Sequence, residues 1–312
     1  MNEQRWQLPF EPYYRQGYGS AYLGDALELI KAIPADSVNL VLTSPPFALT
    51  RKKEYGNEGS DTYVEWFLPF AREFKRVLTD DGSFVLDLGG AYLPGHPVRS
   101  IYQFDLLVRL CKEVGFFFAQ DFYHYNPARL PSPAEWVTVR RVRVKDAVNV
   151  VWWLSQSENP KADNRKVLKP YSDSMKDLLR NGYKPRLRPS GHDISIKFQK
   201  DNNGAIPPNL LTLANTESNS AYLRKCQLSG IKPHPARFPA GFAEFFIKFL
   251  TDENDLVLDP FAGSNTTGSV AEVLGRKWIA FEINHDYLEG SRYRFEQIND
   301  LFSLRNVDGT PH

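Results

Sequence analysis

Apolar residues in this chain form two patterns that alternate along its N-terminal third and return near its C-terminal end. Short β-rich runs indicate buried strands, and the predicted strands are 21–24, 38–42, 83–88, 116–125, 147–155, 255–259 and 277–283. Apolar positions that recur every three or four residues indicate amphipathic helices, and the predicted helices are 26–33, 64–78, 100–114, 240–250 and 266–274. Pro69 predicts a kink in the second helix, and TDDG at 79–82 predicts the turn that ends it.

Strands that alternate with helices predict an α/β fold with a doubly wound, mostly parallel sheet. The alternation fails from about Arg129 to Ile231, where Pro, Asn, Ser and Gly become frequent, although 147–155 still has the pattern of a buried strand. We therefore expect a smaller inserted lobe at 156–230. It would separate one half of the main domain, residues 1–155, from the other half, residues 231–312.

Composition allows this arrangement and limits how the protein could bind nucleic acid. The 312 residues are 42% hydrophobic, enough for one large core and a second lobe. The net charge of +1 excludes a uniformly basic coat, so any contact with DNA must come from a local cluster of cations. Such residues gather in the interrupted region: Arg140, Arg141, Arg143, Lys145, Arg165, Lys166, Lys169, Arg186 and Arg188.

The cysteine and apolar content indicates a cytoplasmic protein without metal. Cys111 and Cys226 lie far apart, and no Cys-x-x-Cys or closely spaced His pair offers a metal site. We expect two reduced thiols. No apolar run approaches the roughly 20 residues that span a bilayer, and the polar start MNEQRWQLPFEPYYRQG lacks the pattern of a signal peptide.

One candidate site is the segment DLVLDPFAGSNTTG at 255–268, where a buried strand enters a turn of small residues and then a helix. Backbone amides in such a turn can approach a polar ligand, and an acid at the end of the next strand can bind a ribose diol. Glu282 has that position. The glycines do not follow G-x-G-x-x-G, which favours a nucleoside carrying an amino acid over a dinucleotide. By itself the segment could also be a plain turn of an α/β fold. The residues that we expect to bind this nucleoside cofactor are Asp259, Phe261, Gly263, Ser264, Asn265, Thr266 and Glu282.

A second candidate site is the turn Ser44, Pro45, Pro46 and Phe47, which follows the predicted strand 38–42. The prolines remove two backbone donors and fix φ, so the Pro45 carbonyl and the Ser44 hydroxyl become rigid acceptors. Two acceptors on an exocyclic amine would favour its attacking geometry and stabilise the charge that develops during methyl transfer. Phe47 could stack on an extruded base. Read alone, this sequence could equally be an ordinary turn.

The two candidate sites are more informative together, because ligands of doubly wound sheets bind where strand order reverses, beyond the carboxyl ends of the strands. Both segments directly follow a predicted strand. If those strands are neighbours in the sheet, Ser44 faces the methyl donor bound by the segment 255–268, although the two segments are far apart in the sequence.

These residues resemble a known family. SPPF at 44–47 resembles the catalytic motif of cytosine-N4 DNA methyltransferases, and DPFAGS at 259–264 resembles their S-adenosylmethionine loop. The order, with the catalytic motif first and the recognition region between the two, is that of the β class of amino-methyltransferases. The likeness extends over nearly the whole chain, notably in SPPFALTRKKEYGN, RVKDAVNVVWW, RPSGHDI, IPPNLL and GIKPHPARFPA. It implies a circularly permuted, Rossmann-like methyltransferase fold with an inserted target-recognition lobe.

The resemblance also implies roles for residues outside the two motifs. Asp25 would lie near the cofactor adenine, and it also suits the N-cap of a helix. Asp87 would lie close to the target pocket and could polarise Ser44, although an acid at a strand end can simply cap a turn. The segment Pro235 to Pro239 would precede the helix that packs over the methionine end of the cofactor.

Candidate contacts with DNA lie in two basic stretches. Arg186, Arg188 and His192 are of types that read base edges or hold phosphates, although charge runs of this kind are usually solvated surface. Three cations directly follow the catalytic turn and could form a flap over DNA or simply an exposed loop: Arg51, Lys52 and Lys53.

The resulting hypothesis is a DNA methyltransferase that moves a methyl group from S-adenosylmethionine to N4 of a cytosine flipped out of double-stranded DNA. The resemblance implies a short palindromic site similar to CAGCTG and a restriction-modification system with a separately encoded endonuclease. An adenine-N6 enzyme of the same class is the alternative, although that branch usually carries Asp or Asn where this chain has Ser44. Methylation of cytosine C5 is disfavoured because it needs a thiolate nucleophile, and neither cysteine follows a proline in a strand-end loop.

Overall fold

A computed structural model describes residues 8–48, 58–182, 200–214 and 220–296 of the chain. Two compact units are distinguished: the larger combines 1–162 with 209–312, and the smaller is Asp163–Pro208. The smaller unit contains the 3-10 helix η2 (Asn164–Val167) and helix α4 (Asp173–Asn181). The larger unit contains the sheet and every element described below.

In the described part of the chain, nine strands form one mixed sheet in the order β1-β2-β9-β8-β3-β4-β6-β5-β7. The strands are β1 (Tyr14–Gln16), β2 (Gly19–Leu23), β3 (Val38–Thr43), β4 (Leu78–Leu88), β5 (Phe117–Tyr125), β6 (Val148–Ser155), β7 (Leu210–Thr212), β8 (Leu256–Asp259) and β9 (Lys277–Glu282). From β2 to β4 all neighbours are parallel, whereas β1 and β6 run antiparallel to their neighbours. The predicted α/β fold with a mostly parallel sheet is confirmed.

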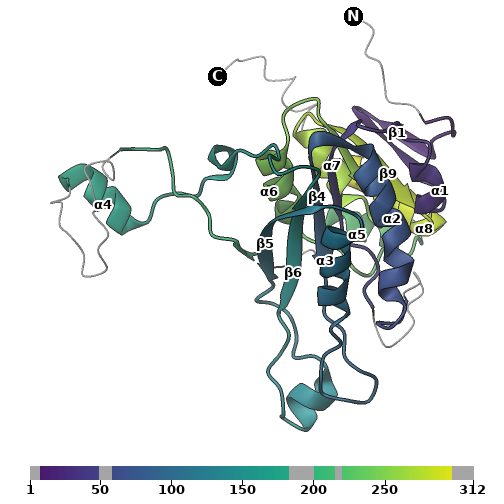
Figure 1. Ribbon diagram of the computed structural model, residues 1–312, viewed down its shortest axis with the longest axis horizontal. Helices are drawn as coiled ribbons and strands as arrows, with labels where there is room; N and C mark the ends of the chain where they lie inside the picture. The colour runs from purple at the N-terminus through teal and green to yellow at the C-terminus, as the bar shows by residue number, and fades with distance from the viewer. Residues whose placement is uncertain (1–7, 49–57, 183–199, 215–219, 297–312) are drawn as a thin grey trace, which may run out of the picture. The chain divides into compact units, whose positions relative to one another are not determined.

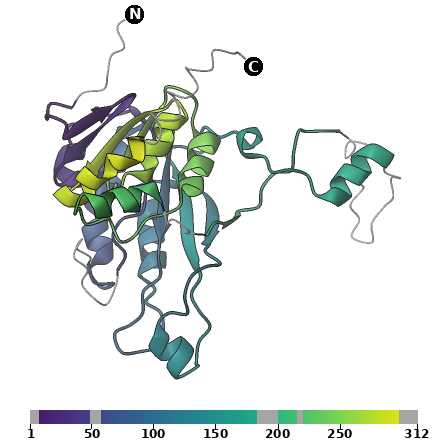
Figure 2. The ribbon, with the colours of Figure 1, turned by 180° about the vertical axis from the view of Figure 1, so that it is seen from behind.

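Helices cover both faces of this sheet, as Figures 1 and 2 show from opposite sides. The helices of the larger unit are α1 (Ala26–Ile30), α2 (Tyr63–Val77), α3 (Tyr102–Lys112), α5 (Ala221–Leu228), α6 (Ala240–Leu250), α7 (Thr266–Val273) and α8 (His285–Ser291). The first three pack on one face and α6 to α8 on the other, because alternate strand residues point to opposite faces. Each face therefore has its own aromatic-rich core.

One predicted turn is wrong. Residues 79–82 lie inside β4 and do not form a separate turn. Val38 pairs with Leu78 and Leu40 already pairs with Ser83, so β4 carries extra residues between these two pairings. The backbone carbonyl of Gly82 accepts a hydrogen bond from the chain after β6, which continues the strand. Residues 79–82 are therefore a bulge within β4, held by hydrogen bonds from the chain after β6. The short elements β1, β7, α5 and α8 were not predicted from the apolar pattern.

The strand order reverses between β3 and β8, which are parallel neighbours. From β3 the chain continues through α2 to β4 on one side, whereas from β8 it continues through α7 to β9 on the other. The carboxyl ends of β2, β9, β8, β3 and β4 therefore share one edge of the sheet. Both candidate motifs lie at this edge, on the two strands that flank the reversal.

Candidate active site

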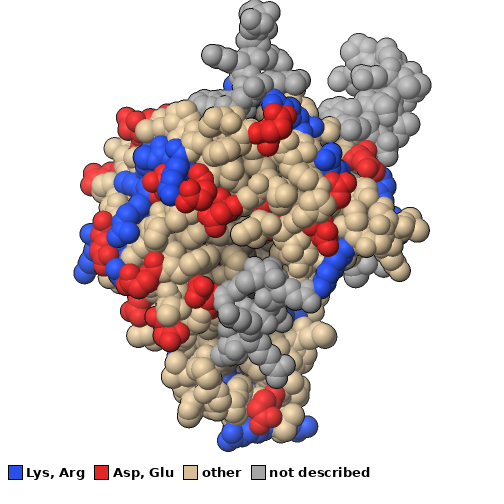
Figure 3. All heavy atoms as spheres, turned by 90° about the vertical axis from the view of Figure 1, so that its right-hand side faces the viewer, with Lys and Arg blue, Asp and Glu red and all other residues tan. Residues whose placement is uncertain are grey.

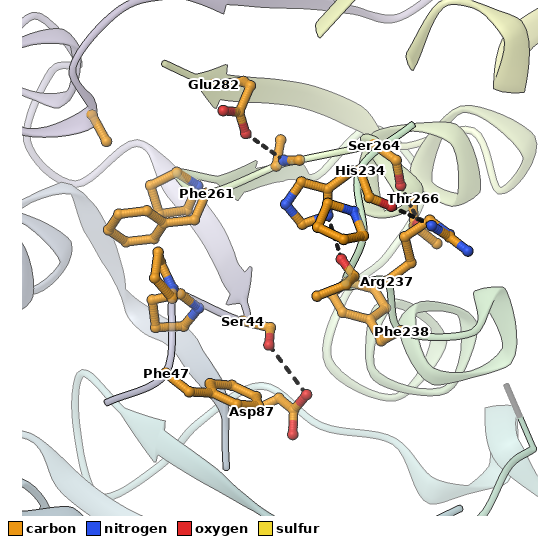
Figure 4. Close-up of a pocket in the computed structure, with 18 of the residues that line it drawn as sticks. Ser44, Phe47, Asp87, His234, Arg237, Phe238, Phe261, Ser264, Thr266 and Glu282 are labelled. Atoms are coloured by element: carbon orange, nitrogen blue, oxygen red, sulfur yellow. Dashed lines mark hydrogen bonds between the residues drawn. The ribbon is translucent and has the colours of Figure 1, made fainter. Parts of the chain in front are cut away.

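A cavity of about 620 Å³ opens at the carboxyl edge of the sheet. Figure 4 shows that its walls come from both sides of the strand reversal, with Ser44 and Asp87 on one side and Glu282, Ser264 and Thr266 on the other. The predicted site residues that line it are Asp25, Ser44, Pro45, Pro46, Phe47, Asp87, Phe261, Gly263, Ser264, Thr266 and Glu282. The structure thus brings the two motifs into one pocket.

Ser44 follows the last residue of β3 and is held by Asp87 on the neighbouring strand β4. The Ser44 hydroxyl donates to Asp87 Oδ2 at 3.2 Å, as the dashed line in Figure 4 marks. Since its proton is engaged there, the oxygen lone pairs of Ser44 are left to accept hydrogen bonds from a ligand. Sequence reasoning ascribed this link to the resemblance, and strand pairing between β3 and β4 provides it.

Asp87 is buried and belongs to a polar group at the end of the sheet. Burial raises the pKa of the Asp87 carboxyl above its ordinary value, while the proximity of His124 and hydrogen bonding with Asn149 and Ser44 oppose this shift. His124 and Asn149 are directly paired across β5 and β6. Among the described residues, Asp87 Oδ1 and His124 Nδ1 are buried polar atoms without a hydrogen-bond partner.

Phe47 lies beside this polar group, with its ring against the backbone of Gly89. A Cβ on Gly89 would come within 2.4 Å of the Phe47 ring, so only glycine permits this approach. The ring is half-buried, and one side of it contributes to the cavity wall. This position suits an aromatic side chain that stacks on a planar ligand.

Asp259 ties the two motifs together from behind the cavity wall. Its carboxylate accepts from the Thr43 hydroxyl at 2.8 Å and from the Thr267 hydroxyl at 2.6 Å. Thr43 ends β3 and Thr267 belongs to the first turn of α7, so one buried acid connects both sides of the strand reversal. Asp259 was predicted as a cofactor ligand, but the cavity-lining residues do not include it.

The titration of Asp259 predicts an effect of pH on stability. Burial raises its pKa to about 6 from 3.8, so the free energy of unfolding that this group supports is greatest below pH 4 and falls as pH rises through 6. The difference corresponds to about 3 kcal/mol. We expect Asp259→Asn to remove this dependence. Urea unfolding of both proteins at intervals between pH 4 and 7 should show the variant gaining relative to wild type as pH rises; a constant difference would contradict this assignment.

Glu282 ends β9 and orders the loop that follows β8. Its two carboxylate oxygens accept from the backbone N–H groups of Gly263 and Asn284, each at 2.8 Å. Burial raises the pKa of the Glu282 carboxyl, and these backbone hydrogen bonds oppose the shift. The side chain also lines the cavity, and each carboxylate oxygen can accept more than one hydrogen bond.

The loop between β8 and α7 follows a path that requires its glycine. Gly263 has a φ of +53°, and a Cβ there would come within 3.1 Å of the His234 ring. Burial lowers the pKa of His234 to about 4, so this ring is neutral at pH 7. Asn265 also has positive φ and caps α7 by accepting from the Gly268 backbone N–H at 3.0 Å. It is fully buried behind the wall, so its side chain shapes the loop.

Other predicted residues have defined local partners. Asp25 accepts from the N–H groups of Leu27 and Glu28 as the N-cap of α1, and it also borders the cavity. Ser264 accepts from the Arg294 guanidinium through both its carbonyl and its hydroxyl oxygen. The predicted DNA contacts Arg51, Lys52, Lys53, Arg186, Arg188 and His192 lie outside the described residues.

Arg237 and Phe238 line the cavity and lie in the stretch 235–239 that the resemblance had singled out, whereas four further lining residues were missed by sequence reasoning: His124, Arg129, Asn149 and His234. A usable signal existed for Asn149, a polar residue in the mostly apolar strand β6, but not for His124, because β5 also carries Gln120 and Asp121. The segment 234–238 precedes α6, in the proline-rich stretch that was singled out only by resemblance. Arg129 carried no distinguishing pattern and reaches the cavity only through folding.

Within the described ranges, no group of three or more His, Cys, Asp or Glu residues is arranged to hold a metal ion. Nor does any helix in those ranges combine the length and apolar character needed to cross a membrane. Both cysteines are free thiols.

Comparison with known proteins identifies relatives over most of the chain. A family model described as DNA methylase, N6_N4_Mtase, matches residues 38–292. The type II methyltransferase M.PvuII of Proteus hauseri is 56% identical over 303 residues, which cover 94% of this chain and 90% of that protein. A solved structure of PvuII DNA methyltransferase (cytosine-N4-specific) matches with a TM-score of 0.76 and 49% identity, covering 97% of this chain and 98% of that one. The structure of TTHA0409 from Thermus thermophilus, complexed with S-adenosyl-L-methionine, has the same fold, with a TM-score of 0.55 at 19% identity; it covers 89% of this chain and 94% of that one.

Proposed function

This chain belongs to the DNA methylase family that contains the N6 and N4 amino-methyltransferases, and from that premise we propose that it methylates N4 of cytosine in double-stranded DNA, with S-adenosylmethionine as donor. One observation carries the proposal. Ser44 directly follows β3, Gly263 lies in the loop after β8, and these two parallel neighbouring strands bring both residues into the wall of the same cavity. The chain is 56% identical to M.PvuII, and the solved PvuII methyltransferase is described as cytosine-N4-specific, which supports cytosine N4 over adenine N6 as the target.

The residues of the cavity fit S-adenosylmethionine, which supplies an electrophilic methyl group when bound. The Glu282 carboxylate is suited to accept hydrogen bonds from a ribose diol. The aromatic ring of Phe261, packed against Phe70 with centroids 5.1 Å apart, offers an apolar surface for the adenine. At the other end of the cavity, Ser264 and Thr266 stand at the N-terminus of α7, where the backbone N–H groups favour a carboxylate.

On the catalytic side, this chain contributes hydrogen-bond acceptors for the amine and a route for the departing proton. The lone pair of a cytosine amine is delocalised into the ring, and hydrogen bonds from the amine to Ser44 Oγ and the Pro45 carbonyl would favour the pyramidal geometry that attacks a methyl group. As the N–C bond forms and the methyl–sulfur bond of the donor breaks, which would leave a neutral thioether, positive charge would pass to the amine nitrogen beside the Asp87 carboxylate. The excess amine proton then passes to Ser44 Oγ, whose own proton moves to Asp87. The raised pKa of Asp87 suits it to receive that proton.

In the proposed reaction the target base leaves the helix, because a stacked base cannot bring its amine into the cavity that Ser44 lines. Phe47, beside Ser44, would stack on the extruded ring. The relationship to M.PvuII supports a short palindromic site similar to CAGCTG, a role in a restriction-modification system and a cytoplasmic location. A cognate endonuclease would act on the same site without forming a stable complex.

The direct test is product analysis. Purified protein is incubated with labelled S-adenosylmethionine and a duplex containing CAGCTG, and the digested nucleosides are separated by chromatography with mass detection. We expect label in N4-methyl-2′-deoxycytidine. Label in N6-methyl-2′-deoxyadenosine would assign the chain to the adenine branch of its family, and label in 5-methyl-2′-deoxycytidine would overturn the role proposed for Ser44.

A second prediction concerns Glu282. Glu282→Ala should weaken S-adenosylmethionine binding by about 1.5–3 kcal/mol, because it removes a charged acceptor for the ribose. Calorimetry on the free protein measures this change, and thermal unfolding without cofactor checks the loss of the two backbone contacts. Glu113→Ala, which removes an exposed carboxylate at the C-terminal end of α3, is the control. Unchanged cofactor affinity in a folded Glu282 variant would place the cofactor elsewhere.

A further inference from the structure

A basic arm (residues 127–147) leaves the sheet at the end of β5 and returns at the start of β6. Figure 1 shows it projecting below the sheet, with the π-helical turn η1 (Glu135–Val139) near its tip. Its two roots belong to the active site, since Arg129 and Ala147 line the same cavity as Ser44. DNA whose target base enters that cavity would therefore pass close to the arm.

The arm is held by specific contacts with the segment after β4. Asp146 accepts from the Tyr92 hydroxyl and from Arg99 at 2.6 Å. Arg143 donates to the Pro97 carbonyl at 2.7 Å and lies over the Tyr92 ring. These contacts use Arg99 and Arg143 to fix the arm, and they neutralise Asp146. Two other cations have contacts within the arm but none with a carboxylate: Lys145 Nζ donates to the Arg129 carbonyl at 3.1 Å, and the Arg140 guanidinium lies over the Trp136 ring.

Three cations of the arm are exposed and have no carboxylate partner among the described residues: Arg140, Arg141 and Lys145. The arm has five cationic and two acidic residues, a net charge of +3 in a chain whose total is +1. Figure 3 shows Lys and Arg side chains gathered at the tip of the lower projection. A local positive charge of this kind favours a polyanion.

The backbone conformation of Arg141 is the most direct indication that the arm binds an external partner. Arg141 has a φ of +54°, directly after the residue that caps η1. This left-handed position at the end of a helical turn usually carries Gly or Asn, because a Cβ is unfavourable there. An arginine at such a position costs backbone energy without any described ion pair in return, which indicates that the side chain serves an interaction outside the chain.

Apolar side chains alternate with these cations along the arm. Val144 is 84% exposed and Leu130 is 79% exposed, and Val139 and Val142 are also exposed. A surface that combines aliphatic groups with arginine and lysine can lie along a DNA groove while its cations reach the phosphates on either side. A solvated charged face would have no need of four exposed aliphatic residues.

We infer that the basic arm is a DNA-contacting element of the catalytic unit, with Arg140, Arg141 and Lys145 on the phosphate backbone next to the extruded base. This inference rests on the proposed function, since it takes the cavity as the base pocket. The arm's residues differ from those that the sequence alone singled out for DNA contact, such as Lys52 and Arg186.

The test measures binding of the full chain to a fluorescent duplex containing CAGCTG over a series of salt concentrations. Each lost phosphate contact should make the slope of log affinity against log salt shallower by about 0.9. Arg141→Gly should show one such step without loss of thermal stability, because glycine adopts the same φ freely. The triple variant Arg140→Ala, Arg141→Gly and Lys145→Ala should show about three. Lys112→Gln, which removes a charge at the C-terminal end of α3, should leave the slope unchanged.

An unchanged slope in a folded triple variant would overturn the inference. The result is independent of the product analysis. Wild-type protein that yields no N4-methyl-2′-deoxycytidine would refute the proposed function, whereas the salt slopes of the variants would still decide whether the arm contacts DNA.

Discussion

Ser44→Ala is expected to leave cofactor and DNA binding nearly intact while the rate of methyl transfer falls by about 10²- to 10³-fold, the typical effect of removing one oriented hydrogen-bonding group from a transition state. The Ser44 oxygen accepts from the amine most strongly when that nitrogen becomes positive, so its loss raises the barrier more than it weakens the ground-state complex. Alanine leaves the turn intact, because the Ser44 side chain has Asp87 as its described hydrogen-bond partner.

Single-turnover kinetics with saturating cofactor and DNA separates transfer from binding. Ser37→Ala is the matched control, since Ser37 directly precedes β3 whereas Ser44 directly follows it, and the Ser37 hydroxyl donates to a backbone carbonyl on the surface. A Ser44 variant with near-normal transfer would exclude the hydroxyl from the chemistry. Transfer lost together with cofactor affinity would instead indicate a damaged pocket.

Asp87→Asn should reduce methyl transfer by about 10²- to 10⁴-fold, the usual contribution of a group that accepts a proton in the reaction. The variant keeps the size of the side chain, but the amide cannot take a proton from Ser44. Burial raises the pKa of Asp87 above that of an ordinary carboxyl. As the solution is made more acidic, wild-type activity should therefore begin to fall at a higher pH than it would with an ordinary carboxyl, and this fall is the acid limb of the pH profile. The variant should lack the acid limb.

The pH profile distinguishes a proton acceptor from a structural side chain, because a purely structural loss lowers the rate equally at every pH. Asp80→Asn provides a control on the same strand, where Asp80 is exposed near the amino end of β4. If Asp87→Asn retains the acid limb of wild type, another group titrates and Asp87 only positions Ser44.

Local sequence by itself determined the elements and the kind of chemistry. Apolar spacing predicted most strands and helices, because the central strands β3, β8 and β9 are buried on both faces and the helices that cover the sheet are buried on one. The motifs at 44–47 and 259–264 identified a DNA methyltransferase, which the family match confirms. These features depend on residues adjacent in the chain, so their signal survives without knowledge of the fold.

Only the tertiary structure decided which side chains share the cavity and what each one contacts. Asp259 was predicted to bind cofactor from its motif, yet its oxygens are occupied by Thr43 and Thr267 behind the wall. His124 and Asn149 carried no motif and reach Asp87 because β5 and β6 extend the sheet beside β4. The turn expected at 79–82 is instead a bulge within β4, between the pairings of Leu78 and Ser83 with β3. In each case the residue's contacts come from parts of the chain that are distant in sequence. The local apolar pattern predicts the strands but not which strands are neighbours in the sheet, and that order determines these contacts.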